Sequence, residues 1–306
     1  MTRNFLDYLV IFFKGIAMGA ADAVPGVSGG TIAFISGIYE ELINTISSIN
    51  FSLIKTLKKE GLSAFWKQCN GNFVVALLSG IIVSYVSFMR LAKYLIENHA
   101  ILIWSFFFGL IVASIFFVGR QIKTWNLTIF ISLALGTIGA YYITTIPSMA
   151  SNEHPMFLFF AGALAICAMI LPGISGSFVL VILGAYKTLS DALHDFDLKK
   201  VALFTLGAIF GLLSFSHVLK WLFKHFYNLT LAFLTGFIFG SLNKIWPWKE
   251  VLTWTENSSG HLVPLIEKSI LPTTYKGDPQ LVFAICLMFI GFLTIFILEK
   301  LDFKRK

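Results

Sequence analysis

Two short stretches rich in glycine, proline and serine contain the residues of this chain that could bind a charged group. They are "VPGVSGGT" at residues 24–31 and "LPGISGSF" at residues 171–178. In each stretch, proline and glycine end one apolar segment, and another apolar segment follows at once. A glycine-rich turn that leads into a helix presents unpaired backbone N–H groups and the positive end of the helix dipole. Both stretches therefore predict a cradle for a phosphate or another anion.

The candidate binding residues come from both stretches, and serine and threonine add hydroxyl groups to the backbone donors. They are Pro25, Gly26, Ser28, Gly29, Gly30, Thr31, Pro172, Gly173, Ser175, Gly176 and Ser177. We expect a positive φ at Gly29 and at Gly176, where a side chain would also fill the space that a ligand needs. The alternative is that these small residues only let helices pack closely. The presence of two copies favours a binding function.

One carboxylate, Asp22, lies three residues before the first proline. A charged group at membrane depth is costly unless it is paired, protonated or hydrated, so Asp22 is a candidate for coupling transport to an ion. The alternative is a helix cap for the segment after the turn. Both interpretations stay open here.

Two enzyme motifs come close to the first stretch and fail. Residues 26–30 fit the G-x-S-x-G of a hydrolase nucleophile elbow, which requires a preceding strand and histidine and aspartate partners. A helix and Pro25 precede the motif instead, and the second copy has Ser177 where the last glycine should be. A nucleotide-binding P-loop would need a Gly-Lys-Ser/Thr sequence, which neither copy contains. We therefore expect no catalytic residue.

The composition is that of a membrane protein. Of 306 residues, 57% are hydrophobic and 13% are charged, whereas a soluble domain carries about a quarter charged residues. Apolar runs of roughly 15 to 21 residues are long enough to cross a hydrocarbon layer of ~30 Å. The net charge of +7 arises in short loops between these runs, so we expect no nucleic-acid partner. Three cysteines without a CxxC pair and scattered histidines predict no disulfide framework, no metal and no cofactor.

The chain contains an internal duplication. Residues 24–46 align with 171–193 at an offset of 147, and further along Gly80 aligns with Gly207 at an offset of 127. Internal duplication is typical of transporters. We predict an all-α polytopic membrane protein of two inverted repeats, residues 1–150 and residues 151–306.

Each repeat is expected to contain a re-entrant helical hairpin and three transmembrane helices. The hairpins would cover residues 5–49 and 156–195, and the helices about 73–92, 101–119, 127–147, 201–219, 229–243 and 281–298. The apolar run after each motif, 31–39 or 178–186, has nine residues and would rise only ~14 Å as a helix. The chain would therefore turn near the midplane, where unwound backbone is tolerated only if it is packed in protein or lines a wet cavity.

The loop charges predict the orientation. With the N-terminus inside, thirteen of the 23 basic residues face the cytoplasm; they are Arg3, Lys55, Lys58, Lys59, Lys67, Arg120, Lys123, Lys220, Lys224, Lys300, Lys304, Arg305 and Lys306. Both termini would then be cytoplasmic, and segments 151–155 and 244–279 would be external.

A few basic residues remain near helix ends and could meet an anionic lipid headgroup. Arg90 and Lys93 are expected at the outer end of the first long helix, and His217 and Lys220 at the inner end of its counterpart. We expect Arg90 to capture a phosphate outside and His217, which can lose its charge near neutral pH, to release it inside. The alternative is that these side chains only anchor helix ends at the interface.

The sequence resembles a known family at three places: "GAADAVPGVSGGTIAFISGIYEELI", "LPGISGSFVLVILGAY" and "GSLNKIWPWK" at residues 240–249. It looks like the bacterial polyprenyl-phosphate transporters, and the resemblance covers nearly the whole chain. It implies a flippase in the bacterial plasma membrane that moves undecaprenyl phosphate from the outer to the inner leaflet, for recycling of the cell-wall carrier lipid. The partners would be this lipid phosphate and membrane lipids, and a homo-oligomer is allowed. The resemblance carries over only to Asp22 and the motif residues named above.

Two alternatives belong to other functional classes. Undecaprenyl-diphosphate phosphatases have similar hairpins with a Pro-Gly-x-Ser-Arg-Ser motif, but Gly29 and Gly176 stand where its arginine would stabilise phosphoryl charge. An ion-coupled small-anion transporter would explain the broken helices equally well.

Overall fold

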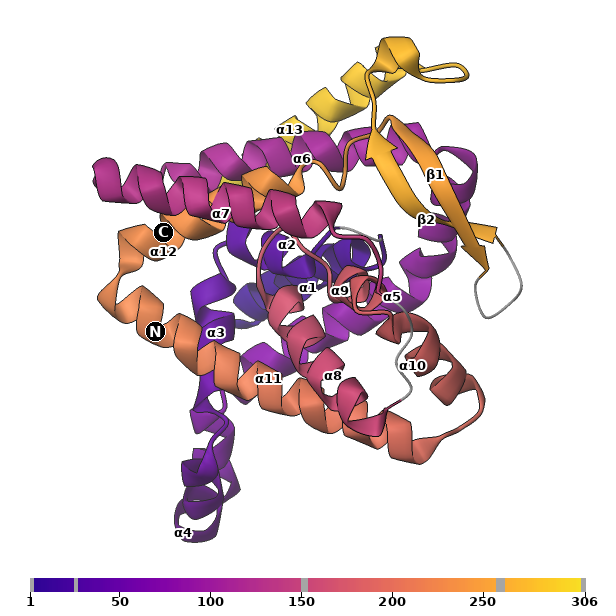
Figure 1. The fold of residues 1–306 in the computed structure, drawn as a ribbon. Helices are drawn as coiled ribbons and strands as arrows, with labels where there is room; N and C mark the ends of the chain where they lie inside the picture. The colour runs from indigo at the N-terminus through magenta and orange to yellow at the C-terminus, as the bar shows by residue number, and fades with distance from the viewer. Residues whose placement is uncertain (1–2, 25–26, 150–153, 257–261, 304–306) are drawn as a thin grey trace.

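The structure is a computed structural model that describes residues 3–24, 27–149, 154–256 and 262–303. It is a bundle of helices with one β-hairpin at its edge (Figure 1). The elements are α1 (Phe5–Asp22), α2 (Gly29–Ile35), α3 (Tyr39–Ser48), α4 (Phe51–Gln68), α5 (Gly71–Asn98), α6 (Ala100–Gly119), α7 (Leu127–Thr145), α8 (Pro155–Ile170), α9 (Gly176–Ile182), α10 (Ala185–His194), α11 (Leu198–His225), α12 (Tyr227–Ser241), β1 (Lys249–Glu256), β2 (Leu262–Ser269), a 3₁₀ turn (Pro272–Thr274) and α13 (Leu281–Phe303).

The six long apolar runs of the sequence form helices α5, α6, α7, α11, α12 and α13. Among the described residues, α5, α6, α7 and α11 are long and apolar enough to cross a membrane, and α8, α12 and α13 contain shorter apolar segments. Helices α9 and α10 would form one more span but are bent by 109°. The chain is therefore a predominantly helical, polytopic membrane protein.

Two features differ from the sequence prediction, one in fold class and one in helix length. The segment after α12 contains the antiparallel pair β1 and β2, because "LTWT" alternates between apolar and polar residues, and threonine and tryptophan favour strands. Helix α5 continues to Asn98, beyond the apolar run that suggested residues 73–92, since Arg90, Lys93 and Glu97 are good helix formers.

The long helices pack in pairs through glycine. Gly80 of α5 lies against the Phe12 carbonyl of α1, and Gly207 of α11 lies against the Phe159 carbonyl of α8. The pairs α6–α13 and α7–α12 also meet glycine to carbonyl, at Gly109–Met288 and Gly236–Leu133, respectively. Close backbone contact of this kind is how helices associate where lipid removes the hydrophobic driving force.

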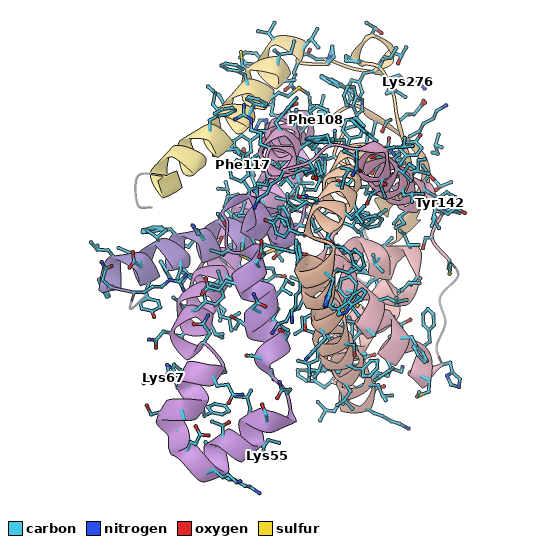
Figure 2. The ribbon with its side chains drawn as sticks, turned by 90° about the vertical axis from the view of Figure 1, so that its left-hand side faces the viewer. Lys55, Lys67, Phe108, Phe117, Tyr142 and Lys276 are labelled. Carbon is cyan, nitrogen blue, oxygen red and sulfur yellow. The ribbon has the colours of Figure 1, made fainter. Side chains whose placement is uncertain are left out.

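Helix α4 forms an arm that projects from the bundle (Figures 1 and 2). Gly61 has a φ of +82° and divides it into two short helices. Lys55 and Lys67 lie on this arm, at the opposite end of the molecule from Lys276, which lies close to the β-hairpin (Figure 2).

Candidate functional site

Each glycine-rich motif opens a short helix; α2 is buried inside the bundle, whereas α9 is partly exposed. Ser28 is the N-cap of α2 and accepts a hydrogen bond from the Gly30 N–H, and Ser175 is the N-cap of α9 and accepts one from the Phe178 N–H. Both helices have seven residues, fewer than the nine-residue apolar run suggested. They end early because Gly37 and Gly184 adopt a φ of +71° and +67°, and a new helix starts in another direction.

The two motifs contact each other directly, although they are more than 140 residues apart in the chain. The Ser28 hydroxyl donates toward the carbonyls of Met169 and Leu171, 3.3 Å from each. The Gly173 N–H donates to the Thr31 hydroxyl at 2.9 Å. Pro172, between these contacts, is fully buried. One compact junction therefore contains residues from both candidate stretches.

The expected positive φ at Gly29 and Gly176 is wrong. Among the described motif glycines only Gly173 has one, +101°, whereas Gly29 and Gly176 begin helices. Glycine is needed there for close approach instead. A Cβ on Gly29 would collide with the Asp22 carboxylate, and a Cβ on Gly176 would lie 2.8 Å from the Ala165 carbonyl oxygen.

The two motifs differ in what they leave available to a ligand. In α2 every residue is buried, and its first N–H groups already donate, Gly29 to Asp22 at 2.7 Å and Gly30 to Ser28 at 3.1 Å. In α9, Ser177 is exposed, and within the described parts of the chain its N–H and that of Gly176 have no acceptor. The second motif is therefore the accessible one in this conformation.

Asp22 caps α2 from the last turn of α1. Its Oδ1 atom accepts the 2.7 Å hydrogen bond from the Gly29 N–H, which would otherwise be an unpaired donor at a buried helix start. This is the capping contact that the sequence left as one of two interpretations.

We expect Asp22→Asn to transport within about twofold of wild type and to keep its pH profile, because the amide oxygen can still accept this bond. Loss of a helix cap costs about 1 kcal/mol of stability. Asp22→Leu, which keeps the size and loses the acceptor, should transport poorly. Initial transport rates at pH 6, 7 and 8 measure both. An Asn variant with normal protein level and no remaining pH dependence would instead establish Asp22 as the coupling group.

The other predicted residues lie apart from the junction or outside the described residues. Pro25 and Gly26 belong to the latter group. Arg90 and His217 are exposed on α5 and α11, and neither has a hydrogen bond or ion pair to a motif residue in the described structure; the His217 Nδ1 atom lies 2.7 Å from the Leu213 carbonyl.

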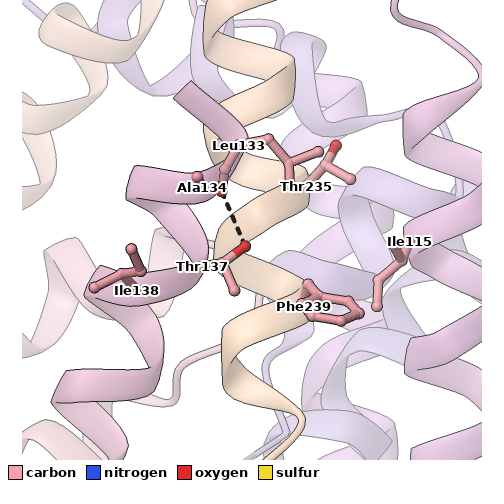
Figure 3. A pocket seen from close by; sticks show the side chains of 7 residues that line it. All are labelled: Ile115, Leu133, Ala134, Thr137, Ile138, Thr235 and Phe239. Atoms are coloured by element: carbon pink, nitrogen blue, oxygen red, sulfur yellow. Dashed lines mark hydrogen bonds between the residues drawn. The ribbon is translucent and has the colours of Figure 1, made fainter. Parts of the chain in front are cut away.

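A separate cavity of about 370 Å³ lies between α6, α7 and α12 (Figure 3). Its walls are apolar, and the two threonine hydroxyls at its edge are bonded to their own helices, Thr137 to Leu133 and Thr235 to Leu231. The cavity presents no polar group to a phosphate, so it is not part of the candidate anion site.

Sequence reasoning missed a cation beside the second motif. The Lys244 Nζ atom lies 4.6 Å from the centre of the Phe178 ring, and Phe178 follows Ser177 in α9. The available signal was the segment at 240–249, where Lys244 and Lys249 flank a tryptophan-rich turn. This segment carries part of the family resemblance, but nothing in its sequence alone connects its lysines to the glycine-rich motifs.

Comparison with known proteins gives the family. The profile of the undecaprenyl phosphate translocase-like family matches residues 18–263. The chain belongs to this family. A polyprenyl-phosphate transporter of Vibrio cholerae is 45% identical over 304 residues, which cover 98% of this chain and 99% of that protein. A Staphylococcus aureus protein of the same name is 31% identical over 252 residues, 76% of this chain and 84% of that protein. Both members are named as transporters rather than enzymes, and no solved structure matches significantly.

Proposed function

We propose that this protein moves undecaprenyl phosphate from the outer to the inner leaflet of the bacterial plasma membrane. The observation that carries the proposal is the junction of the two motifs, in which Ser28 and Thr31 contact residues 169–173. Two broken helices that meet inside a helical membrane bundle are typical of a transporter's substrate site. The family relatives bear the name of this substrate class.

An inverted-repeat architecture, with one re-entrant hairpin in each half, fits the helix packing. The contact Phe12–Gly80 recurs as Phe159–Gly207, at the offsets of 147 and 127 that align the sequence copies. The second helix of each half, α6 or α12, packs on the third helix of the other half, α13 or α7. The two halves at residues 1–150 and 151–306 would thus interlock through equivalent contacts.

The proposed orientation places both termini in the cytoplasm. Segments assigned to the inside touch one another: Arg3 donates to Glu41 at 2.7 Å, and the Lys123 N–H donates to Asn228 at 3.3 Å. Segments assigned to the outside do the same, since Asn243 donates to Thr144 at 3.0 Å. Lys55 and Lys276 lie at opposite ends of the molecule (Figure 2), as this orientation requires.

The exposure of two equivalent tyrosines favours a conformation that is closed inside and open outside. Tyr39 begins α3 and is 2% exposed, with its ring 6.0 Å from that of Phe223 in α11. Its counterpart Tyr186, on α10, is 51% exposed. Exchange of these two environments would open the inner motif and close the outer one, as alternating access requires.

Single-cysteine labelling with a membrane-impermeant thiol reagent checks both the orientation and the conformation that is open to the outside. Each cysteine is introduced into a variant that lacks Cys69, Cys167 and Cys286. Because only outward-facing, exposed sites react, we expect Tyr186→Cys to be labelled on intact cells, and Lys58→Cys to be labelled only after lysis. Tyr39→Cys should react at least about tenfold more slowly than Tyr186→Cys after lysis, since burial restricts access. Labelling of residue 58 from outside would contradict the proposed topology.

Arg90 and His217 would act away from the junction, as first and last contacts for the headgroup on the two faces. Their exposure on α5 and α11 is compatible with this role and with simple anchoring. The direction proposed for transport does not depend on them.

Purified protein in liposomes that contain a fluorescent polyprenyl phosphate tests the function. We expect exchange between leaflets and no phosphate release. Release of phosphate from a polyprenyl diphosphate would favour a phosphatase-like enzyme, and uptake of a small anion without lipid exchange would favour an ion-coupled anion carrier. Either result would contradict the proposal.

A further inference from the structure

Two lysines and one glutamate form a compact charge cluster between the β-hairpin and the accessible motif. Lys244 and Lys249 lie 3.6 Å and 3.3 Å from the same oxygen, Oε2 of Glu267. Two ammonium groups thus share a single carboxylate, which leaves an excess of one positive charge. Glu267 lies on β2, whereas both lysines come from the turn and strand after α12.

Aromatic rings hold the two ammonium groups in place. Lys244 lies over Phe178 of α9 at 4.6 Å, and Lys249 lies over Trp104 of α6 at 4.9 Å from the ring centre. The Lys249 ammonium also donates to the Lys244 carbonyl at 2.7 Å. A cation above an aromatic face keeps much of its attraction for an anion, because the ring does not neutralise its charge.

Several hydrogen bonds fix the backbone around this cluster. Asn243 donates to Thr144 of α7 at 3.0 Å and accepts from the Ser269 hydroxyl at 2.9 Å. Trp246 and Trp248 each donate through the indole N–H to a backbone carbonyl, of Ile270 and Pro279. Lys244 is therefore presented toward α9 by a fixed turn rather than by a free loop.

Burial makes the excess positive charge costly. Lys249 is only 11% exposed, and desolvation lowers its pKa to about 8 in spite of the nearby Glu267 carboxylate. A phosphate monoester carries more negative charge than a single carboxylate, so in the place of Glu267 it would neutralise the two lysines more completely and relieve that cost.

We propose that Lys244 and Lys249 form the outer docking site for the phosphate monoester of the lipid substrate, and that Glu267 occupies this site until the phosphate displaces it. The proposal rests on the proposed function and adds a second subsite to the motif junction. The phosphate would first pair with Lys244 and then reach the exposed Ser177, one residue before the Phe178 ring on which Lys244 lies.

Equilibrium binding to the full-length protein in nanodiscs tests this, with farnesyl phosphate, inorganic phosphate and farnesol as probes. Lys244→Gln should weaken the binding of both phosphate probes about tenfold, as expected for one lost charge-assisted contact, and should leave the binding of farnesol unchanged. Glu267→Gln should bind both phosphate probes about threefold more tightly, because a competing anion is gone. Lys276→Gln, in the same external segment but paired with Glu250, is the matched control and should bind like wild type.

The opposite signs of the two main variants separate a binding role from a structural one, since a damaged fold would weaken binding in both. Wild-type affinity in Lys244→Gln, or a loss in Glu267→Gln as large as in Lys244→Gln, would overturn the inference and leave the proposed function intact. A wild-type protein that binds neither phosphate probe would overturn both. If Lys244→Gln weakens the binding of farnesyl phosphate and leaves that of inorganic phosphate unchanged, the site binds the lipid headgroup rather than free phosphate.

Discussion

Gly29→Val and Gly176→Val are expected to insert into the membrane and to lose transport, by about 100-fold, the cost typical of displacing a binding backbone by ~1 Å. At Gly29 the new side chain would displace the Asp22 carboxylate that caps α2. At Gly176 it would press on the Ala165 carbonyl, whose position is fixed within α8. Leaflet exchange in liposomes, normalised to protein level, measures the effect.

The matched control is Gly139→Val in α7. Gly139 is also a helical glycine in the membrane region, but a Cβ there would meet no heavy atom within 4 Å. It should transport at the wild-type rate. If Gly29→Val and Gly176→Val transport as well as Gly139→Val, the motifs serve only to pack helices.

Thr31→Val should weaken the contact between the two motifs while preserving side-chain shape. It removes the hydroxyl that accepts from the Gly173 N–H and leaves that buried donor unpaired, which costs about 1–3 kcal/mol. Since the motif junction would be both less stable and less ordered, transport should fall about tenfold, the equivalent of 1.4 kcal/mol. Thermal unfolding in detergent and leaflet exchange give the two readouts.

Thr235→Val provides the comparison, because Thr235 is also buried but donates to the Leu231 carbonyl of its own helix. That carbonyl keeps its helical partner, so no buried group is left unpaired. If Thr31→Val is as stable and transports as fast as Thr235→Val, the junction between the motifs has no functional importance.

Much of the fold could be predicted because apolar runs and glycine-rich breaks are local signals. The long helices appear where the runs predicted them, and both motifs open short helices capped by Ser28 and Ser175. Helix ends were less certain, since Arg90 and Glu97 end the apolar run without ending α5. Charged residues that favour helix formation can extend a span beyond the hydrocarbon layer.

The candidate site was predicted only in part because its key contacts are not local. The hydrogen bonds of Ser28 and Thr31 to the second motif join residues more than 140 positions apart, and one sequence contains no pairing information over that distance. The positive φ was assigned to the wrong glycines because Ser28 and Ser175 take the extended cap position and Gly29 and Gly176 enter the helix. Lys244 was missed because an isolated lysine in an aromatic segment is more often an interfacial anchor.

A structure determined with polyprenyl phosphate bound in a lipid bilayer tests the central claim most directly. The claim predicts phosphate density at the start of α9, within hydrogen-bond distance of the Ser177 hydroxyl or the backbone N–H groups of Gly176 and Ser177, with the isoprenoid chain extending into the lipid. Phosphate density bound away from both α9 and the Lys244–Lys249 cluster, with the start of α9 unoccupied, would contradict it.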